Sequence, residues 1–359
     1  MAIQRLAIVG TGLIGASIGL AAKRAGVAEV VGSDADEEHI RAALERGAID
    51  AAAPDLDADL VVVAVPVAQL PTRVRDVLAS TRHATVTDVG STKSSVVAAA
   101  GGDPRFVGGH PVCGSEARGP AHANAELFED ATWFLTPAAQ TDAQRYRALH
   151  GFVSSLGAVP VAIDPRAHDR LMAMTSHLPH VLANVLLNHA GASRVEGHEP
   201  LAAAGGSLRD MTRVAGANPR IWVDIFLDNA DALRDSLGEH RRRIEQVEEA
   251  LANGDAGFLA RWIGEAATNR RAMLADAYPD ATDLHRLRVH VPVRPGVLAG
   301  ITQTLGAERI NIEDFELQHV SAERGGTLTL LVAGAAEADR AASLLETMGY
   351  GVLVAPVEK

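Results

Sequence analysis

Short apolar runs alternate with helix-compatible segments through the first 165 residues of the chain. The runs are rich in Val, Ile, Leu and Ala, as is typical of strands that are buried on both faces of a parallel sheet. Helices are predicted between them, among others over 17–25, 69–79 and 142–156. The predicted strands are 6–9, 29–33, 59–65, 85–89, 132–135 and 159–163. This alternation predicts an α/β domain with a mostly parallel sheet over residues 1–165.

The strand pattern stops at Pro165, and helical spacing replaces it. Between residues 167 and 190, apolar side chains recur at intervals of three, four and seven, which predicts a long helix. Pro179 lies inside this helix and is expected to bend or loosen it, because proline has no N–H to donate. Further helices are predicted from Asn218, over 228–251 and over 258–277. Residues 166–281 are therefore expected to form an all-helical domain.

The last 75 residues have a third pattern. Leu287, Val289, Val291 and Val293 alternate with polar residues, which predicts a strand with one buried face. A helix over 297–305, strands over 310–320 and 327–332, a helix over 335–348 and a strand over 351–354 follow. The order βαββαβ predicts a ferredoxin-like domain over residues 285–359.

A glycine-rich turn follows the first predicted strand. Gly10, Gly12 and Gly15 form the spacing GxGxxG, with Leu13 and Ile14 between the last two glycines, and a helix follows. In this context the first glycine permits a tight turn, the second lets the backbone approach a pyrophosphate, and the third lets the helix pack against the strand. The turn predicts a Rossmann-type dinucleotide site.

The second predicted strand ends at Asp34, 22 residues after Gly12. A carboxylate at this place accepts hydrogen bonds from ribose hydroxyls and repels a 2′-phosphate, so we expect NAD rather than NADP as the cofactor. Pro66, which follows the strand at 59–65, is expected to begin a loop under the nicotinamide. The predicted cofactor-binding residues are Gly10, Gly12, Leu13, Ile14, Gly15, Asp34 and Pro66.

Composition narrows the choice of partners and compartment. The 359 residues carry a formal net charge of −12, which disfavours nucleic acid as a partner. The single cysteine, Cys113, rules out an intrachain disulfide and fits a reducing compartment. The apolar run at 60–67 is too short to span a bilayer, and the N-terminus has no pattern of a signal peptide. We expect a soluble, cytoplasmic protein with no membrane partner.

The candidate chemistry centres on His110, which stands after two glycines and before a proline in Gly108-Gly109-His110-Pro111. The segment predicts a strand end that opens into a tight, exposed loop. The turns at 10–15, 90–93 and 109–116 are expected to converge at the carboxyl edge of the sheet, where ligands of such folds bind. Ser91 is then a candidate neighbour of His110 that holds its tautomer, and equally a candidate cap for a helix at 94–100.

Two further groups have alternative interpretations. His177 and His180 share a helix face and would suit a metal, but no third ligand stands in register, so we expect no metal and a histidine that lines a cleft. Arg209 and Arg213 follow a glycine-rich stretch and are either an anion clamp or solvated charges that pair with Asp210 or Asp224.

Together these motifs resemble the prephenate/arogenate dehydrogenase family of tyrosine biosynthesis. They are the glycine turn from Gly10 to Ser17, Asp88-Val89-Gly90-Ser91-Thr92-Lys93, Gly108-Gly109-His110-Pro111 with Gly114-Ser115-Glu116, His168-Asp169 with Ser176-His177-Leu178-Pro179-His180, and Asp210-Met211-Thr212-Arg213. Val89 departs from the polar residue of many relatives. The tail, with Arg294-Pro295-Gly296-Val297-Leu298 and Ile310-Asn311-Ile312-Glu313-Asp314, is similar to an ACT domain, a module that binds small ligands.

The resemblance implies roles for particular residues. His110 would accept a hydrogen bond or a proton from the substrate 4-hydroxyl, and Ser91 would position it. The substrate-binding residues would be Arg213, Ser115, Glu116, His180 and His168. A homodimer through the helical domain and tyrosine as an effector at the ACT domain are further implications.

Other activities stay open at this point. Arogenate differs from prephenate by an ammonium group, which Glu116 would favour electrostatically. A β-hydroxyacid dehydrogenase is disfavoured because such enzymes rely on a lysine in the helical domain, whereas this chain has lysines only at 23, 93 and 359. A non-catalytic amino-acid sensor is disfavoured because Asp34, Ser91, His110 and Arg213 are all present.

Overall fold

The computed structural model describes residues 3–53, 56–113, 119–277, 283–292, 294–321 and 325–357. The chain divides into two compact units, residues 1–241 and 242–359, and each is described by itself. Among the described helices, none is both long enough and apolar enough to cross a membrane.

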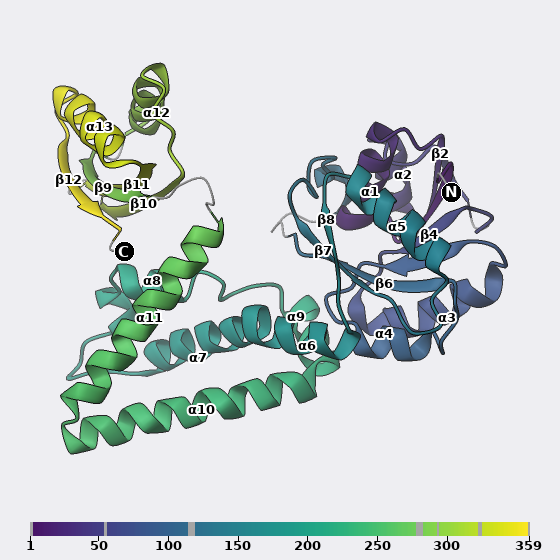
Figure 1. Ribbon diagram of the computed structural model, residues 1–359, viewed down its shortest axis with the longest axis horizontal. Coiled ribbons are helices and arrows are strands. Elements are labelled where there is room, and N and C mark those ends of the chain that lie inside the picture. The colour runs from purple at the N-terminus through teal and green to yellow at the C-terminus, as the bar shows by residue number, and fades with distance from the viewer. Residues whose placement is uncertain are drawn as a thin grey trace. The chain divides into compact units, whose positions relative to one another are not determined.

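The first unit contains an eight-stranded sheet with the order β3-β2-β1-β4-β5-β6-β7-β8 (Figure 1). All neighbouring strands are parallel except β6 and β7, which are antiparallel. The strands are β1 (Arg5–Val9), β2 (Glu29–Ser33), β3 (Ala51–Ala52), β4 (Leu60–Val63), β5 (Thr85–Asp88), β6 (Phe106–Pro111), β7 (Thr132–Thr136) and β8 (Val159–Ala162). The order reverses beside β1, so the loops after β1 and β4 open at one edge, where a dinucleotide binds in such sheets.

Helices cover both faces of this sheet, and each face has its own apolar core. Ile18 of α1 and Phe152 of α5 pack on one face, whereas Val74 of α3 and Val96 of α4 pack on the other. The helices are α1 (Leu13–Arg24), α2 (Glu37–Glu45), α3 (Leu70–Ser80), α4 (Ser94–Ala99) and α5 (Ala143–Ser155), with short 3-10 turns at Val67–Gln69 and Pro120–His122. The Rossmann-type fold predicted for this part is therefore present.

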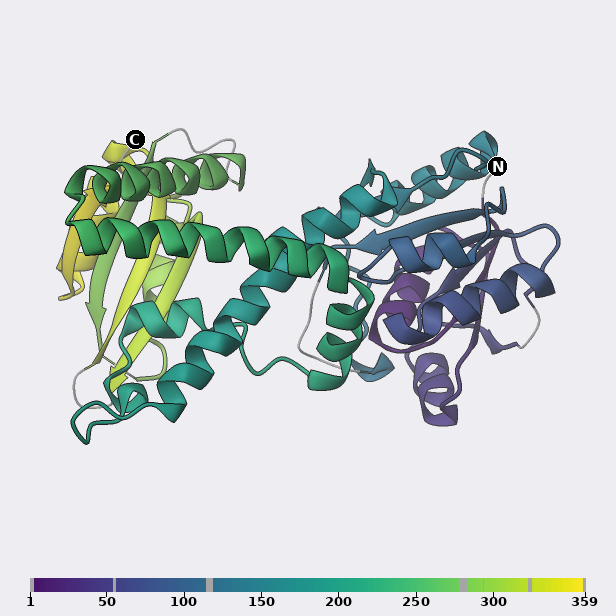
Figure 2. The same ribbon diagram turned by 90° about the horizontal axis from the view of Figure 1, so that it is seen from below.

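Helices make up the rest of the first unit. Helix α6 (Pro165–Met172) continues through a π turn (Ala173–His177) into α7 (Leu178–Ala192), as Figure 2 shows in teal. The loosening expected at Pro179 takes the form of this π turn, which ends two residues before the proline. A 3-10 turn (Pro200–Ala203), α8 (Gly206–Met211) and α9 (Pro219–Asp228) follow, and α10 (Ala230–Asn253) runs on past residue 241.

The second unit comprises the end of α10, α11 (Ala256–Ala277) and a four-stranded antiparallel sheet with the order β10-β11-β9-β12. Its elements are β9 (Leu284–Val291), α12 (Val297–Ala307), β10 (Asp314–Ser321), β11 (Gly325–Ala333), α13 (Ala335–Thr347) and β12 (Gly351–Pro356). Helices α12 and α13 pack through Ile301 and Leu345 onto the buried side chains of β9 and β11. The predicted βαββαβ order is confirmed, while the turn before Gly325 lies outside the described residues.

One expectation about the site was wrong: His110 does not lie in an exposed loop. It belongs to β6 and pairs with Phe134 of β7, and its side chain is buried. The two glycines before it belong to the same strand. A Cβ on Gly109 would lie 2.6 Å from the Asp88 carbonyl oxygen of the neighbouring strand. They are needed for close approach of neighbouring strands rather than for a turn.

Candidate functional site

The glycine turn has the geometry that a dinucleotide requires. Gly10 has a φ of 97°, and a Cβ there would overlap the Ala64 carbonyl group. Gly12 is the N-cap of α1, no side chain caps the helix, and nothing lies within 4 Å of the place of its missing Cβ. A Cβ on Gly15 would overlap the Gly10 carbonyl oxygen. The free amides at the start of α1 therefore face open space that an anionic phosphate can enter.

Asp34 lies beside the glycine turn and binds its main chain. One carboxylate oxygen accepts the Thr11 main-chain N–H at 2.7 Å, and the other accepts the Asp36 N–H at 2.9 Å. These bonds fix the carboxylate directly after β2, next to the glycine turn. The oxygen that binds the Thr11 N–H also lies 3.4 Å from the Thr11 hydroxyl group and 3.4 Å from Nδ1 of His39, whereas the oxygen that binds the Asp36 N–H retains a lone pair for a ribose hydroxyl. Pro66 is exposed in the loop after β4, two residues beyond Ala64.

A buried ion pair joins the ends of β5 and β6. Lys93 and Asp88 are both fully buried, and the Lys93 ammonium group donates to Asp88 and, at 2.7 Å, to the Gly109 carbonyl oxygen. Asp88 also accepts the main-chain N–H of Gly90 at 2.8 Å and of Gly109 at 3.1 Å. The turn after β5 and the residue before His110 are therefore held by the same two side chains.

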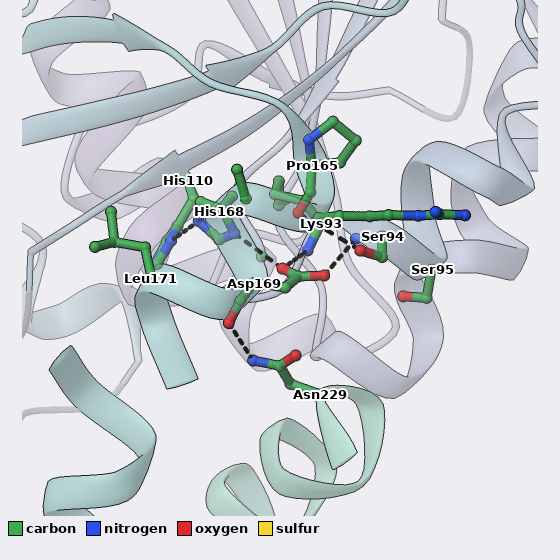
Figure 3. Close-up of polar contacts among 12 residues, drawn as sticks. Lys93, Ser94, Ser95, His110, Pro165, His168, Asp169, Leu171 and Asn229 are labelled. Carbon is green, nitrogen blue, oxygen red and sulfur yellow. Dashed lines mark hydrogen bonds and ion pairs between the residues drawn. The ribbon is translucent and has the colours of Figure 1, made fainter. Parts of the chain in front are cut away.

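The imidazole of His110 is held by a second route (Figure 3). Its Nδ1 lies 2.9 Å from Nε2 of His168, and Nδ1 of His168 lies 2.9 Å from Oδ1 of Asp169. Both residues come from α6. Asp169 also accepts the main-chain N–H groups of Lys93 at 2.7 Å and Ser94 at 2.8 Å, so it caps α4.

Asp169 is also connected to a group of aromatic and polar side chains from the helices that follow it in the sequence. Asn229 donates to the Asp169 carbonyl oxygen at 2.8 Å and contacts Nδ1 of His177 at 3.1 Å. The ring of Trp222 lies edge-on to the ring of His177. It also stacks on the ring of His180, and the centroids of these two rings are 3.5 Å apart. His177 and His180 thus have aromatic and amide neighbours, and the described residues contain no group of three potential metal ligands.

The other predicted site residues are placed as follows. Ser91 lies half-buried in the turn after β5, but the residue that contacts Nδ1 of His110 is His168, and Asp169 rather than Ser91 caps α4. His168 is fully buried, which argues against direct contact with a substrate. Arg213 is exposed and lies two residues after the end of α8. Ser115 and Glu116 lie outside the described residues.

Burial decides the protonation of the central groups. It lowers the pKa of His110 well below its usual value, with His168 and Lys93 adding to the effect and Asp169 opposing it. Burial alone would raise the pKa of Asp169, but hydrogen bonds from His168, Ser94 and Lys93 bring it below its ordinary value. Burial also lowers the pKa of His177 to about 4. At neutral pH the site therefore presents a neutral imidazole at position 110, linked through His168 to an ionised carboxylate, and a neutral imidazole has a lone pair that can accept a proton.

Sequence reasoning had no role for Lys93, Asp88 or Asp169, although all three stand in motifs that the sequence analysis singled out. Lys93 is one of only three lysines in the chain, and it lies in the turn after a buried strand that ends in an acidic residue, Asp88. That pattern is a signal for a buried ion pair. The contact of Asp169 with Lys93 joins residues 76 positions apart, and no local pattern predicts it.

Comparisons with known proteins give consistent results. A family model described as prephenate dehydrogenase, nucleotide-binding domain, matches residues 18–162, and one described as prephenate dehydrogenase, dimerization domain, matches 164–265. The chain is 34% identical over 337 residues to a prephenate dehydrogenase of Bacillus subtilis, with 90% of each protein covered. It is 33% identical over 293 residues to a cyclohexadienyl dehydrogenase of Zymomonas mobilis, covering 76% of this chain and 97% of the relative.

Solved structures are similar as well. A prephenate dehydrogenase from A. aeolicus in complex with hydroxyphenyl propionate and NAD+ superposes with a TM-score of 0.72 at 27% identity, covering 76% of this chain and 99% of that one. An arogenate dehydrogenase of Synechocystis does so with a TM-score of 0.69 at 28% identity, covering 75% and 99%.

Proposed function

Because the chain belongs to the prephenate dehydrogenase family, we propose that it catalyses the NAD-dependent oxidative decarboxylation of prephenate to 4-hydroxyphenylpyruvate. The observation that carries this proposal is the neutral, buried imidazole of His110. His110 lies near the carboxyl end of β6, at the same edge of the sheet as the glycine turn after β1. The cofactor is NAD, and the open amides at Gly12 together with Asp34 fit its pyrophosphate and ribose. Bound there, NAD+ supplies the acceptor for the hydride that leaves C4 of the substrate.

The residues of this chain handle the proton. His110 accepts the proton of the 4-hydroxyl as the hydride leaves, which gives a dienone. Loss of CO₂ then makes the ring aromatic and leaves a phenolate, to which His110 returns the proton. The dianion becomes a monoanion, CO₂ and the transferred hydride, so charge and atoms balance. A base that is held in position contributes roughly 10²–10⁴-fold to such a step.

Steady-state rates with two substrates and two nucleotides test the proposal. We expect NADH formation with prephenate and NAD+, and much weaker reduction of NADP+, because Asp34 repels a 2′-phosphate. Faster turnover of arogenate than of prephenate would instead identify an arogenate dehydrogenase. The absence of NADH formation with either substrate would contradict the function.

Arg213 is proposed to bind a substrate carboxylate. Its guanidinium group is exposed and forms no hydrogen bond within the described part of the chain, so it is available for an anion. We expect Arg213→Ala to raise KM for prephenate about 10- to 100-fold, with little change in KM for NAD+, because a charge-assisted hydrogen bond contributes about 1.5–3 kcal/mol. Arg220→Ala, at an exposed position of α9, is the control. Equal KM values for the two variants would contradict the role.

Ser91, in the turn after β5, and His180, on α7, are proposed to contact the substrate. The family resemblance implies the same role for Ser115 and Glu116. The proposed domain boundaries are 1–165, 166–281 and 285–359. A homodimer through the helical domain is supported by the match to a dimerization domain and by exposed apolar residues on α7 and α9: Val185, Ile221, Val223 and Leu227.

The C-terminal sheet is proposed to be an ACT domain that binds tyrosine. A cavity of about 340 Å³ lies where β9 leads into α12 and includes Arg294, Gly296 and Leu328 in its lining. Gly296, with a φ of 87°, begins α12 without a side-chain cap, so main-chain amides are available for a carboxylate. Apolar side chains on the other wall suit the ring of an aromatic amino acid.

A bulky side chain placed in this cavity tests whether tyrosine binds there. Tyrosine is expected to change the activity or the thermal stability of the protein, and Ala299→Trp should abolish that response because Ala299 lines the cavity from an exposed position. Ala307→Trp, at the exposed end of the same helix, is the matched control. A tyrosine response that persists in Ala299→Trp, or that is missing from the unaltered protein, would contradict the site.

A further inference from the structure

Hydrogen bonds around Asp169 determine which nitrogen of each histidine carries a proton. The carboxylate receives N–H groups from Lys93 and Ser94, and its Oδ1 also contacts Nδ1 of His168. An ionised carboxylate only accepts hydrogen bonds, so Nδ1 of His168 must carry a proton. A neutral imidazole carries a single N–H, so the Nδ1–H of the buried His168 leaves its Nε2 as an acceptor.

The same reasoning extends to His110. Its Nδ1 lies 2.9 Å from the acceptor Nε2 of His168, so Nδ1 of His110 carries the proton and Nε2 carries a lone pair. We propose that His168 and Asp169 are positioning residues that hold His110 in the tautomer whose Nε2 accepts the substrate proton. This inference rests on the proposed function for its catalytic consequence, but the tautomer itself does not depend on any substrate.

The hydrogen bonds around His110 form a closed set that restrains both its ring and its backbone. The main-chain N–H of Lys93 binds Asp169, and the side chain of Lys93 binds the carbonyl oxygen of Gly109, the residue before His110. One residue therefore anchors both the imidazole of His110, through Asp169 and His168, and its backbone. When His110 takes up a proton, its Nδ1–H still points through His168 to the charge of Asp169, which stabilises the imidazolium.

The first test is the tautomer. In protein labelled with ¹⁵N-histidine, ring nitrogen shifts are measured without substrate, and the signals of His110 are identified by their loss in His110→Asn. We expect a protonated Nδ1 and an unprotonated Nε2. In His168→Leu, where no acceptor faces Nδ1, we expect a substantial Nε2–H population. A wild-type His110 that carries its proton on Nε2 would overturn the proposal.

The second test is kinetic and uses a conservative variant. A glutamine at position 168 offers a carbonyl oxygen to His110 and an amide N–H to Asp169, so it preserves the direction of both hydrogen bonds, whereas leucine preserves neither. We expect His168→Leu to lower kcat about 10- to 100-fold with KM for NAD+ unchanged, and His168→Gln to recover at least tenfold of that loss. His150→Leu, on the exposed side of α5, is the control.

The outcomes separate the two proposals. Equal kcat values for His168→Leu and His168→Gln would overturn the positioning role, since volume and burial alone would then explain the site. If prephenate is not a substrate, the proposed function fails, while the ring nitrogen shifts still decide the tautomer.

Discussion

Replacing His110 by asparagine is expected to lower kcat by about 10²–10⁴-fold, because the positioned proton acceptor is lost. Asparagine is smaller and neutral, and it fits a strand position whose backbone is held by the contacts of Lys93 and Asp88 with Gly109. The affinity for NAD+ should change little, since the glycine turn and Asp34 come from other strands. Single-turnover rates and NAD+ titrations measure the two quantities separately.

The pH dependence supplies the control for this variant. Burial and the neighbouring His168 and Lys93 hold the pKa of His110 below its usual 6.5, so the imidazole remains neutral to lower pH. The acid limb of kcat/KM is therefore expected below pH 6.5 in the unaltered protein and should be absent from His110→Asn. Unimpaired turnover in the variant, or the same acid limb in both proteins, would remove His110 from the mechanism.

Replacing Lys93 by methionine is expected to destabilise the first unit by about 3–5 kcal/mol. Methionine has a similar length but leaves the carboxylate of Asp88 buried without its cationic partner, and removal of one member of a buried pair has this cost. The Gly109 carbonyl oxygen also loses a donor. The free energy of unfolding in urea, followed by a probe in the first unit, measures the effect.

Lys23→Met is the matched control for this stability prediction. Lys23 pairs with Asp50 at 2.6 Å, but both side chains are partly exposed, and such a pair contributes at most about 1 kcal/mol. Adding Asp88→Asn to Lys93→Met should recover part of the loss, because the unpaired charge is then removed. A loss in Lys93→Met no larger than in Lys23→Met would mean that the buried pair does not stabilise the fold.

The elements that carry the cofactor could be predicted from the sequence because they depend on local chemistry. The strand, the GxGxxG turn and the helix are contiguous, and the roles of Gly10, Gly12 and Gly15 follow from their spacing. Asp34 is likewise placed by the end of its strand. The βαββαβ order of the tail also followed from periodicity, because alternation of buried and exposed positions is fixed by the strand itself.

The contacts around His110 could not be predicted in this way. The glycines beside it suggested a loop, yet they lie in a strand that approaches β5 closely, and only the paired strands reveal that constraint. Ser91 was the nearest candidate partner along the chain, but the partner at Nδ1 is His168, 58 positions away.

The sequence by itself therefore determined the three kinds of element along the chain and the dinucleotide turn, and it singled out His110 as the candidate base. Periodicity and turn chemistry act over a few residues, and this is enough to specify such features. The tertiary structure alone decided that α6 brings His168 and Asp169 against β6 and the start of α4, and the tautomer that we propose for His110 depends on these contacts. Protonation of a buried ring depends on the groups that folding places around it, and these groups come from parts of the chain that no local pattern connects.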